Sequence, residues 1–437
     1  MSVVIKEKRM HRIDRKSFVK LAAGAAGASA MGNWKAAFAA GTKNEAVGKA
    51  WKGWNAGDFQ VHFIYTGVGE SMFIIFPDST TMLLDCGDFD AASRGDLALP
   101  LLPDGSRHAG EWIARYVKRV NPNGSDVDYM LISHFHRDHM GTAKWCKDVV
   151  RRGNRDYHLT GFSLAAETLH FRRAIDRTGG AFDSRELFEP SENQFPYLLD
   201  CLYGYLKARD GLEVEKLRLG ATDQIVCLHG GTNGFSVKNI CANGRLALAD
   251  GGVLDALRPD GKMPWYWNEN HLSCGHVFKY GRFGFFTAGD FSGPAMDSQG
   301  VTRWPETQLA KTVSSPVSVA KIDHHGFKSM PDELLRALRA KVYAACTWDV
   351  LHLTDDCLAR FANPSNCEKG TLLVPGNFGA SRRTAANADG RALFPEAVYG
   401  GVHSVIDVPP GGETFAVSLI DARDEDMRVV FYREFES

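Results

Sequence analysis

Four potential metal ligands fall within six residues of this chain. The run His-Phe-His-Arg-Asp-His supplies the side chains of His134, His136, Asp138 and His139. It follows an apolar stretch at 128–133 that is typical of a buried strand, and alternate residues of an extended segment point the same way. We therefore expect His134 and His136 to hold one ion together, and Asp138 and His139, beyond the turn, to face a second. Imidazole and carboxylate ligands suit zinc, with manganese or iron as alternatives.

The elements around the cluster must hold these side chains in place. A strand at 128–133 leads into the cluster, and we expect a helix over 142–150 to follow it. Loops between strands and helices are where such sites are usually built. Strands and helices alternate along most of the chain, including a helix at about 108–120, which predicts a layered α/β domain.

Two later motifs also follow expected strands. Asp290 ends the strand-like run at 285–287, and a carboxylate there can place one oxygen on each of two ions held roughly 3.5–4 Å apart. His324 and His325 follow the strand at 319–322. We expect His324, the first of the pair to leave the strand, to bind metal and His325 to line the site.

The order of these motifs carries a family resemblance. Asp-Cys-Gly (85–87), His-x-His-x-Asp-His (134–139), Gly-Asp (289–290) and His-His-Gly (324–326) each follow an expected strand and resemble the metallo-β-lactamase superfamily. The resemblance covers about residues 58–360. It implies an αββα four-layer sandwich of the metallo-β-lactamase type, with helical and loop insertions and a dinuclear site at one edge of two facing sheets.

Two further segments point to one branch of that superfamily. Gly-Val-Gly-Glu-Ser (67–71) and the segment 268–273 are similar to the hydrolase domain of competence-type DNA-uptake channels. Relatives in that branch include phosphodiesterases and phosphorylcholine esterases. The resemblance therefore implies a phosphodiester or a related phosphate ester as the substrate.

The resemblance also implies individual roles. Asp85 would not bind metal but would orient a ligand histidine through its second ring nitrogen. The family's usual His-Thr-Pro-Gly-His stretch is missing from this sequence, so we expect His271, nineteen residues before Asp290, to complete the first metal site, with His276 as the alternative. His352 would donate a proton or contact a phosphate.

The ligand set predicts a metal-dependent hydrolase. Two divalent ions, with Zn²⁺ preferred over Mn²⁺ or Fe²⁺, would share a bridging water and supply hydroxide near neutral pH, with Asp138 orienting this nucleophile. Hydrolysis of a lactone or a β-lactam amide is the second interpretation. A metal-binding protein without turnover is the third.

Charge is unevenly distributed along the chain. The formal net charge is −1, but residues 1–39 carry eight basic and two acidic side chains, which leaves −7 on the remainder. A body this acidic argues against a stable nucleic-acid partner. We expect a small-molecule or phosphodiester substrate instead.

The basic N-terminus predicts an export signal at 1–40. Arg-Lys-Ser-Phe-Val-Lys (15–20) precedes a short, weakly apolar run with Ala-x-Ala sites, which resembles a twin-arginine signal. The run is too short to span a bilayer, and no later stretch is long enough to do so either. The protein would meet the export machinery transiently and reach the periplasm or the exterior, with the cytoplasm as the alternative. Nine scattered cysteines without a Cys-x-x-Cys pair do not form a disulfide framework, which fits folding before export.

The remainder is expected to be one domain. A polar spacer at 41–57 would lead into a metallo-hydrolase domain at 58–437. Insertions are expected near 160–215 and 243–268, and the tail after residue 400 is expected to be rich in strands.

Overall fold

The computed structural model describes residues 45–180, 195–231, 234–258, 267–296, 300–374 and 401–437. These belong to one compact unit that spans residues 44–437. The expected export signal at 1–40 lies outside the described residues. Within the described part of the chain, none of the helices has the length and apolar character needed to cross a membrane.

The first sheet is mixed. Its strands are antiparallel from one edge as far as β3, and the next three run parallel to β3 and to one another. In order across the sheet the strands are β21 (Val429–Glu436), β20 (Thr414–Asp421), β19 (Val402–Val408), β1 (Phe59–Phe63), β2 (Met72–Ile75), β3 (Thr81–Leu84), β4 (Asp126–Leu131), β7 (His170–Asp176) and β8 (Glu213–Lys216).

The second sheet is also mixed. Its strands are antiparallel as far as β13, and three parallel strands complete it. In order they are β11 (Val253–Asp255), β10 (Arg245–Ala247), β9 (Phe235–Ala242), β12 (Gly275–Tyr280), β13 (Phe283–Thr287), β16 (Val319–Lys321), β17 (Val342–Ala344) and β18 (Leu372–Val374). Two small hairpins stand apart: β5 (Asp148–Arg152) with β6 (Arg155–Leu159), and β14 (Ala295–Met296) with β15 (Thr302–Arg303).

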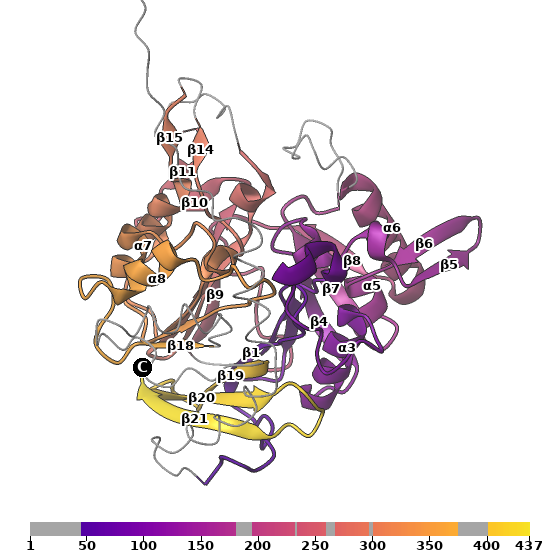
Figure 1. Cartoon of the computed structure of the whole chain (residues 1–437), viewed down its shortest axis with the longest axis horizontal. Coiled ribbons are helices and arrows are strands. Elements are labelled where there is room, and N and C mark those ends of the chain that lie inside the picture. The colour runs from indigo at the N-terminus through magenta and orange to yellow at the C-terminus, as the bar shows by residue number, and fades with distance from the viewer. Residues whose placement is uncertain (1–44, 181–194, 232–233, 259–266, 297–299, 375–400) are drawn as a thin grey trace, which may run out of the picture. The chain divides into compact units, whose positions relative to one another are not determined.

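Both faces of the central strands are buried, so each sheet needs a packed layer on either side. In β2, Ile74 belongs to the core shared by the two sheets, whereas Phe73 belongs to the core that includes helical side chains. In β13, Phe285 likewise belongs to the core shared by the two sheets, whereas Phe286 belongs to the core between the second sheet and its helices. This follows from the two-residue period of a strand, and burying a side chain such as Phe73 contributes roughly 1.5–3 kcal/mol. Two mixed sheets thus pack face to face, with helices on their outer faces (Figure 1).

The helices divide between the two outer faces. Those that pack on the first sheet are α3 (Ala109–Val120), α5 (Phe162–Ala165) and α6 (Phe195–Asp210). Those on the second are α7 (Asp332–Leu338) and α8 (Asp355–Ala362), with the 3₁₀ helix η4 (Pro305–Thr312). The remaining short helices lie in loops: α4 (Arg137–Met140), η1 (Ala91–Leu97), η2 (Ala143–Trp145), η3 (Glu269–Leu272) and η5 (Asp323–Gly326).

The prediction of an α/β domain is confirmed, but one expected element is wrong. The helix expected over 142–150 is replaced by η2 and the first strand of the β5–β6 hairpin. Gly141 ends α4 with φ 90°, and a Cβ at that position would lie 2.5 Å from Thr160 Oγ1. The adjacent Val149 and Val150 then favour an extended strand over a helix.

The expected spacer and insertions contribute to the sheets and the core. Trp51 and Trp54, from the spacer, pack against the core. The segment near 160–215 supplies β7 and β8 as well as α5 and α6, and the segment near 243–268 supplies β10 and β11, with 259–266 outside the described residues. The tail after residue 400 forms three strands, and β19 pairs with β1.

Candidate metal centre

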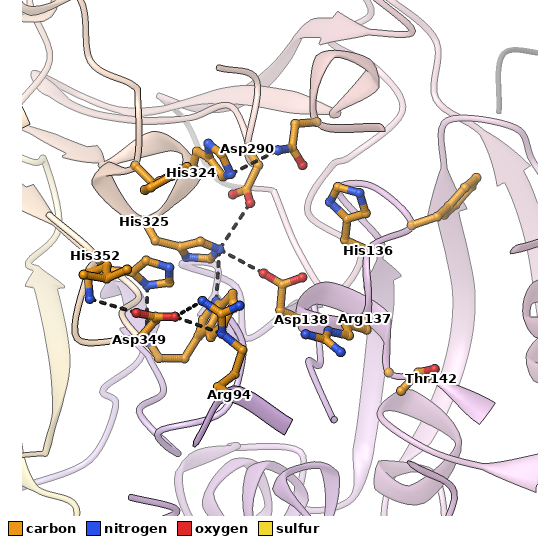
Figure 2. A pocket seen from close by; sticks show the side chains of 16 residues that line it. Arg94, His136, Arg137, Asp138, Thr142, Asp290, His324, His325, Asp349 and His352 are labelled. Atoms are coloured by element: carbon orange, nitrogen blue, oxygen red, sulfur yellow. Dashed lines mark hydrogen bonds and ion pairs between the residues drawn. The ribbon is translucent and has the colours of Figure 1, made fainter. Parts of the chain in front are cut away.

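The site is assembled where strands of both sheets end. The histidine cluster follows β4 of the first sheet, whereas Asp290 and His325 follow β13 and β16 of the second. Because β13 and β16 are parallel neighbours, their carboxyl ends bring these two residues to the same edge. Figure 2 shows Asp138 and Asp290 converging on the ring of His325.

A buried group of four side chains could hold a metal ion: Glu70, His139, Asp290 and His325. The Oδ2 atom of Asp290 lies 3.0 Å from His139 Nε2 and 3.2 Å from His325 Nε2. No side chain in this group is more than 2 % exposed. Four buried ligands at this spacing favour a cation at their centre.

Asp138 completes the group better than Glu70 does. Its Oδ2 lies 3.1 Å from His325 Nε2 and 3.5 Å from His139 Nε2. An ion bound tetrahedrally at about 2.0–2.1 Å separates its ligand atoms by about 3.3–3.4 Å, which matches these distances. Glu70 is instead 3.1 Å from the ammonium of Lys321 and lies 3.5 Å from Nδ1 of His325, the nitrogen on the other side of that ring.

Hydrogen bonds fix which nitrogen of each ring faces the group. His325 donates from Nδ1 to the carbonyl of Cys346 at 2.6 Å, which leaves Nε2 for a metal. Nδ1 of His139 lies 2.8 Å from Asp85 Oδ2, and the same carboxylate accepts the backbone N–H of Ser133 at 2.7 Å. Such outer contacts orient a ligand ring and raise its basicity. Asp85 makes the contact expected of an orienting residue.

The turn that carries His325 is strained. His324 and His325 have φ values of 48° and 54°, in the left-handed region. Each such residue costs roughly 1–2 kcal/mol. Gly326 continues the turn with φ 77°, where a Cβ would lie 2.7 Å from Leu353. The backbone N–H of Leu353 donates to the carbonyl of His325 at 3.0 Å, so the surrounding loop holds the strained turn. Strain retained in this way is common at functional sites.

His134 and His136 lie next to this group. His134 Nε2 lies 3.1 Å from His136 Nδ1 and 3.9 Å from Asp290 Oδ2. The ring of His134 is fully buried and packs 4.1 Å from that of His139. Asp290 Oδ2 therefore approaches both His134 and His139, as expected of a carboxylate shared by two ions.

The metal-free site concentrates negative charge around imidazoles. Burial alone would lower the pKa of His139 and of His325, but the carboxylates of Asp290 and Asp138 have the larger, opposite effect. They raise the pKa of His325 to about 9 and the pKa of His139 well above its usual value. Burial raises the pKa of both carboxyls, yet the same histidines hold them well below their ordinary range. A cation that replaces the imidazole protons would meet ionised carboxylates.

Three histidines that the sequence offered as metal ligands lie outside both this group and the His134–His136 pair. His271 Nδ1 accepts the backbone N–H of Asn268 at 3.1 Å, and the residue is not among those that line the cavity. His276 is paired inside β12 and contacts Asn239 at 3.0 Å. His324 lines the cavity, with Nε2 3.0 Å from the side-chain amide of Asn270. The structure thus places His325 in the metal group and His324 on the wall, the reverse of the sequence-based assignment.

His352 lines the cavity beside the metal group. Its ring stacks on that of His325 at 4.7 Å with an interplanar angle of 14°. The cavity has a volume of about 560 Å³. Its wall also includes Arg94 and Arg137, which Figure 2 shows, and the aromatic side chains of Phe327 and Trp348.

Glu70 pairs with Lys321, a contact that the sequence motifs did not predict. Glu70 follows the end of β1 in the Gly-Val-Gly-Glu-Ser segment, and Lys321 ends β16. The lysine also lies 3.6 Å from Asp290 Oδ1 and donates to the carbonyl of Gly289 at 2.7 Å. An acidic residue in a motif that already carried the family resemblance was the one signal in the sequence.

Comparisons with known proteins give no assignment. No model of a known protein family matches the chain, and no curated protein matches it.

Proposed function

We propose that this chain is a metal-dependent hydrolase of the metallo-β-lactamase superfamily, in its competence-type branch, and that it acts on phosphodiesters or related phosphate esters. One observation carries the proposal. The Nε2 atoms of His139 and His325 each lie 3.0–3.5 Å from Oδ2 of Asp138 and of Asp290, and His134 Nε2 lies 3.9 Å from Asp290 Oδ2.

The arrangement of the elements supports this superfamily. Two mixed sheets pack face to face with helices outside, and the candidate site lies at the ends of strands from both sheets. An αββα sandwich of the metallo-β-lactamase type has this plan. The four motifs also occur in the expected order along the chain.

The side chains of the site would have different roles in the reaction. Asp138, His139, His325 and Asp290 would hold one divalent ion, and His134 and His136 with Asp290 a second. Two such ions activate a water and stabilise the negative charge that develops during hydrolysis. Zn²⁺ fits a set of histidines and carboxylates at this spacing, with Mn²⁺ or Fe²⁺ as alternatives. Asp138 also orients the attacking water.

We infer that His352, which lines the cavity, serves the leaving group. The backbone N–H of Trp348 donates to its Nδ1 at 3.3 Å, so the neutral ring carries its proton on Nε2. Burial and the charge on His325 lower the pKa of His352 well below its usual value, which keeps the ring neutral. A neutral imidazole can still donate its Nε2–H to a substrate oxygen.

The cavity wall favours an anionic substrate. Arg137 lies between His136 and Asp138 in the sequence, is exposed, and holds its guanidinium 4.7 Å from the ring centroid of Phe89. Guanidinium groups match phosphate oxygens in geometry and charge. A phosphate ester uses this feature, whereas a neutral lactone does not.

A paired variant tests the proposal. His134→Ala with His136→Ala should reduce bound metal, measured by elemental analysis, and abolish hydrolysis of bis-nitrophenyl phosphate. His158→Ala with His170→Ala removes two histidines outside the group and should leave both properties unchanged. Undiminished turnover in the first variant would contradict the assignment.

The same assay separates the alternatives. Turnover of a lactone or of nitrocefin, without turnover of the phosphodiester, would favour the amide and lactone interpretation. Stoichiometric metal without any turnover would favour a metal-binding protein.

We also propose that residues 1–40 direct export after metal has been acquired in the cytoplasm. Replacing Arg15 and Lys16 by glutamine in the full chain should leave the protein in the cytoplasmic fraction. Unchanged export of that variant would contradict a twin-arginine signal.

A further inference from the structure

The indole of Trp348 points at the nitrogen that the metal group needs. Its Nε1 lies 3.2 Å from Nε2 of His325. The same nitrogen lies 3.1 Å from Asp138 Oδ2 and 3.2 Å from Asp290 Oδ2. Three polar groups therefore converge on a single ring atom.

This atom cannot satisfy all three groups at once. The Nδ1–H of His325 already donates to the carbonyl of Cys346, so Nε2 has either one lone pair or one proton. The indole N–H only donates and the carboxylates only accept when ionised. If Nε2 directs its lone pair to a cation between the carboxylates, the N–H of Trp348 needs another acceptor. That acceptor must lie beside the cation, on the cavity side, since Trp348 lines the cavity.

The surrounding chain holds the indole in place. The backbone N–H of Leu99 donates to the carbonyl of Trp348 at 3.3 Å, and Ala98 forms a bridge with Asp349. Arg94 donates from Nε to Asp349 at 3.0 Å and lies 5.6 Å from the centroid of the Trp348 ring. The edge of Phe89 packs against the same ring at 5.0 Å. A donor fixed in this way needs little reorganisation when charge develops on an oxygen next to it.

We propose that Trp348 Nε1–H binds an anionic phosphate oxygen of the substrate in the metal-loaded site. This rests on the proposed function and assigns a catalytic residue to it. The donor strengthens its hydrogen bond as negative charge grows on that oxygen, so it lowers the barrier as well as contributing to binding. Its contact with the substrate is separate from the roles of the metal ligands.

The test removes the N–H and keeps an aromatic ring. Trp348→Phe is compared with Trp112→Phe, an identical change at a tryptophan of α3 whose indole donates to the carbonyl of Asp104 and which is not among the residues that line the cavity. Metal content, binding of inorganic phosphate to the zinc-loaded protein by calorimetry, and hydrolysis of bis-nitrophenyl phosphate are measured for each. We expect Trp348→Phe to keep its metal, to bind phosphate about tenfold more weakly and to lose about 10- to 100-fold in kcat. Trp112→Phe should match the wild type in all three.

Each other outcome has a distinct meaning. If Trp348→Phe matches Trp112→Phe in phosphate binding and kcat while the wild type is active, the role of Trp348 is overturned and the proposed function stands. If Trp348→Phe loses metal, the indole acts by orienting His325 and the proposal is again overturned. If the zinc-loaded wild type neither binds phosphate nor hydrolyses the ester, the proposed function fails, and the role of Trp348 fails with it.

Discussion

The carboxylate of Glu269 binds the guanidinium of Arg177 through two hydrogen bonds of 2.7 and 2.9 Å, and neither side chain is exposed to solvent. The pair also reaches the histidine cluster. Glu269 Oε1 accepts the backbone N–H of Phe135 at 3.1 Å, and the guanidinium lies 4.4 Å from the centroid of the Phe135 ring. Since Phe135 separates His134 from His136, this pair positions the backbone between two candidate ligands.

The first prediction concerns this pair. Glu269→Gln should destabilise the metal-free protein by about 3–5 kcal/mol, because it leaves the Arg177 charge buried without its partner. It should also weaken binding of the metal ion that we propose for His134 and His136. The double replacement Arg177→Met with Glu269→Met should cost less than the two single changes combined. Urea unfolding and metal titration measure both effects, and additive costs would contradict the coupling.

A second prediction concerns Asp85 and the ring that it orients. Asp85→Asn keeps the shape of the side chain and tolerates the residue's φ of 61°. It removes the carboxylate that contacts His139 Nδ1, so metal affinity should fall by about 10- to 100-fold. Competition with a zinc chelator measures the affinity. Asp88→Asn, a neighbouring buried residue whose carboxylate accepts the N–H of Gly161, serves as the control. Equal affinities in the two variants would contradict an orienting role for Asp85.

Local sequence patterns were enough to find the loops of the site. The apolar run at 128–133 and the amphipathic run at 108–120 predicted β4 and α3, because strands and helices carry their own periodicities. The motifs at their ends then predicted which loops would meet. Asp290 and His139 do lie 3.0 Å apart, although they come from different sheets.

Features that depend on one dihedral angle or on distant contacts could not be predicted. Which of His324 and His325 enters the metal group depends on two consecutive left-handed residues, and the sequence shows no signal for them. The pairing of Glu70 with Lys321 and the position of Trp348 depend on chain segments that meet only after folding. Arg177 follows a strand of the first sheet, β7, in a segment that was expected to be an insertion.

A third prediction follows from the buried lysine under the site. Lys321 is fully buried between Glu70 and Asp290. Burial alone would lower its pKa, but these two carboxylates have the larger effect and raise the pKa above its usual value. Lys321→Met removes that positive charge, so the metal-free protein should lose about 3–5 kcal/mol of stability. Bound metal supplies positive charge to the same carboxylates, so the loss should be smaller in the zinc-loaded protein.

Thermal unfolding with a chelator and with zinc measures the two losses. Lys279→Met, on an exposed position of β12, provides the control for the loss of a lysine. An equal loss with and without zinc would show that Lys321 does not share its partners with the metal.

The last prediction concerns acid stability. Burial lowers the pKa of His276 to about 3 in the folded protein, whereas an unfolded histidine titrates near 6.5. Between these values the unfolded chain binds a proton that the folded protein does not, so the free energy of unfolding falls as the pH decreases from about 6.5 towards 3. At pH 5 this histidine alone lowers the free energy of unfolding by about 2 kcal/mol relative to its value at pH 7.

His276→Asn removes the titration and retains a donor towards Asn239, which His276 contacts through Nδ1 at 3.0 Å. Urea unfolding of the metal-free protein should therefore show a smaller difference between pH 7 and pH 5 in this variant, by about 2 kcal/mol. Above pH 7.5 the two proteins should depend on pH in the same way, because His276 is neutral in both states there. An unchanged difference between pH 7 and pH 5 would mean that His276 takes up its proton in the folded protein, and the neutral, packed role of this histidine in β12 would then be wrong.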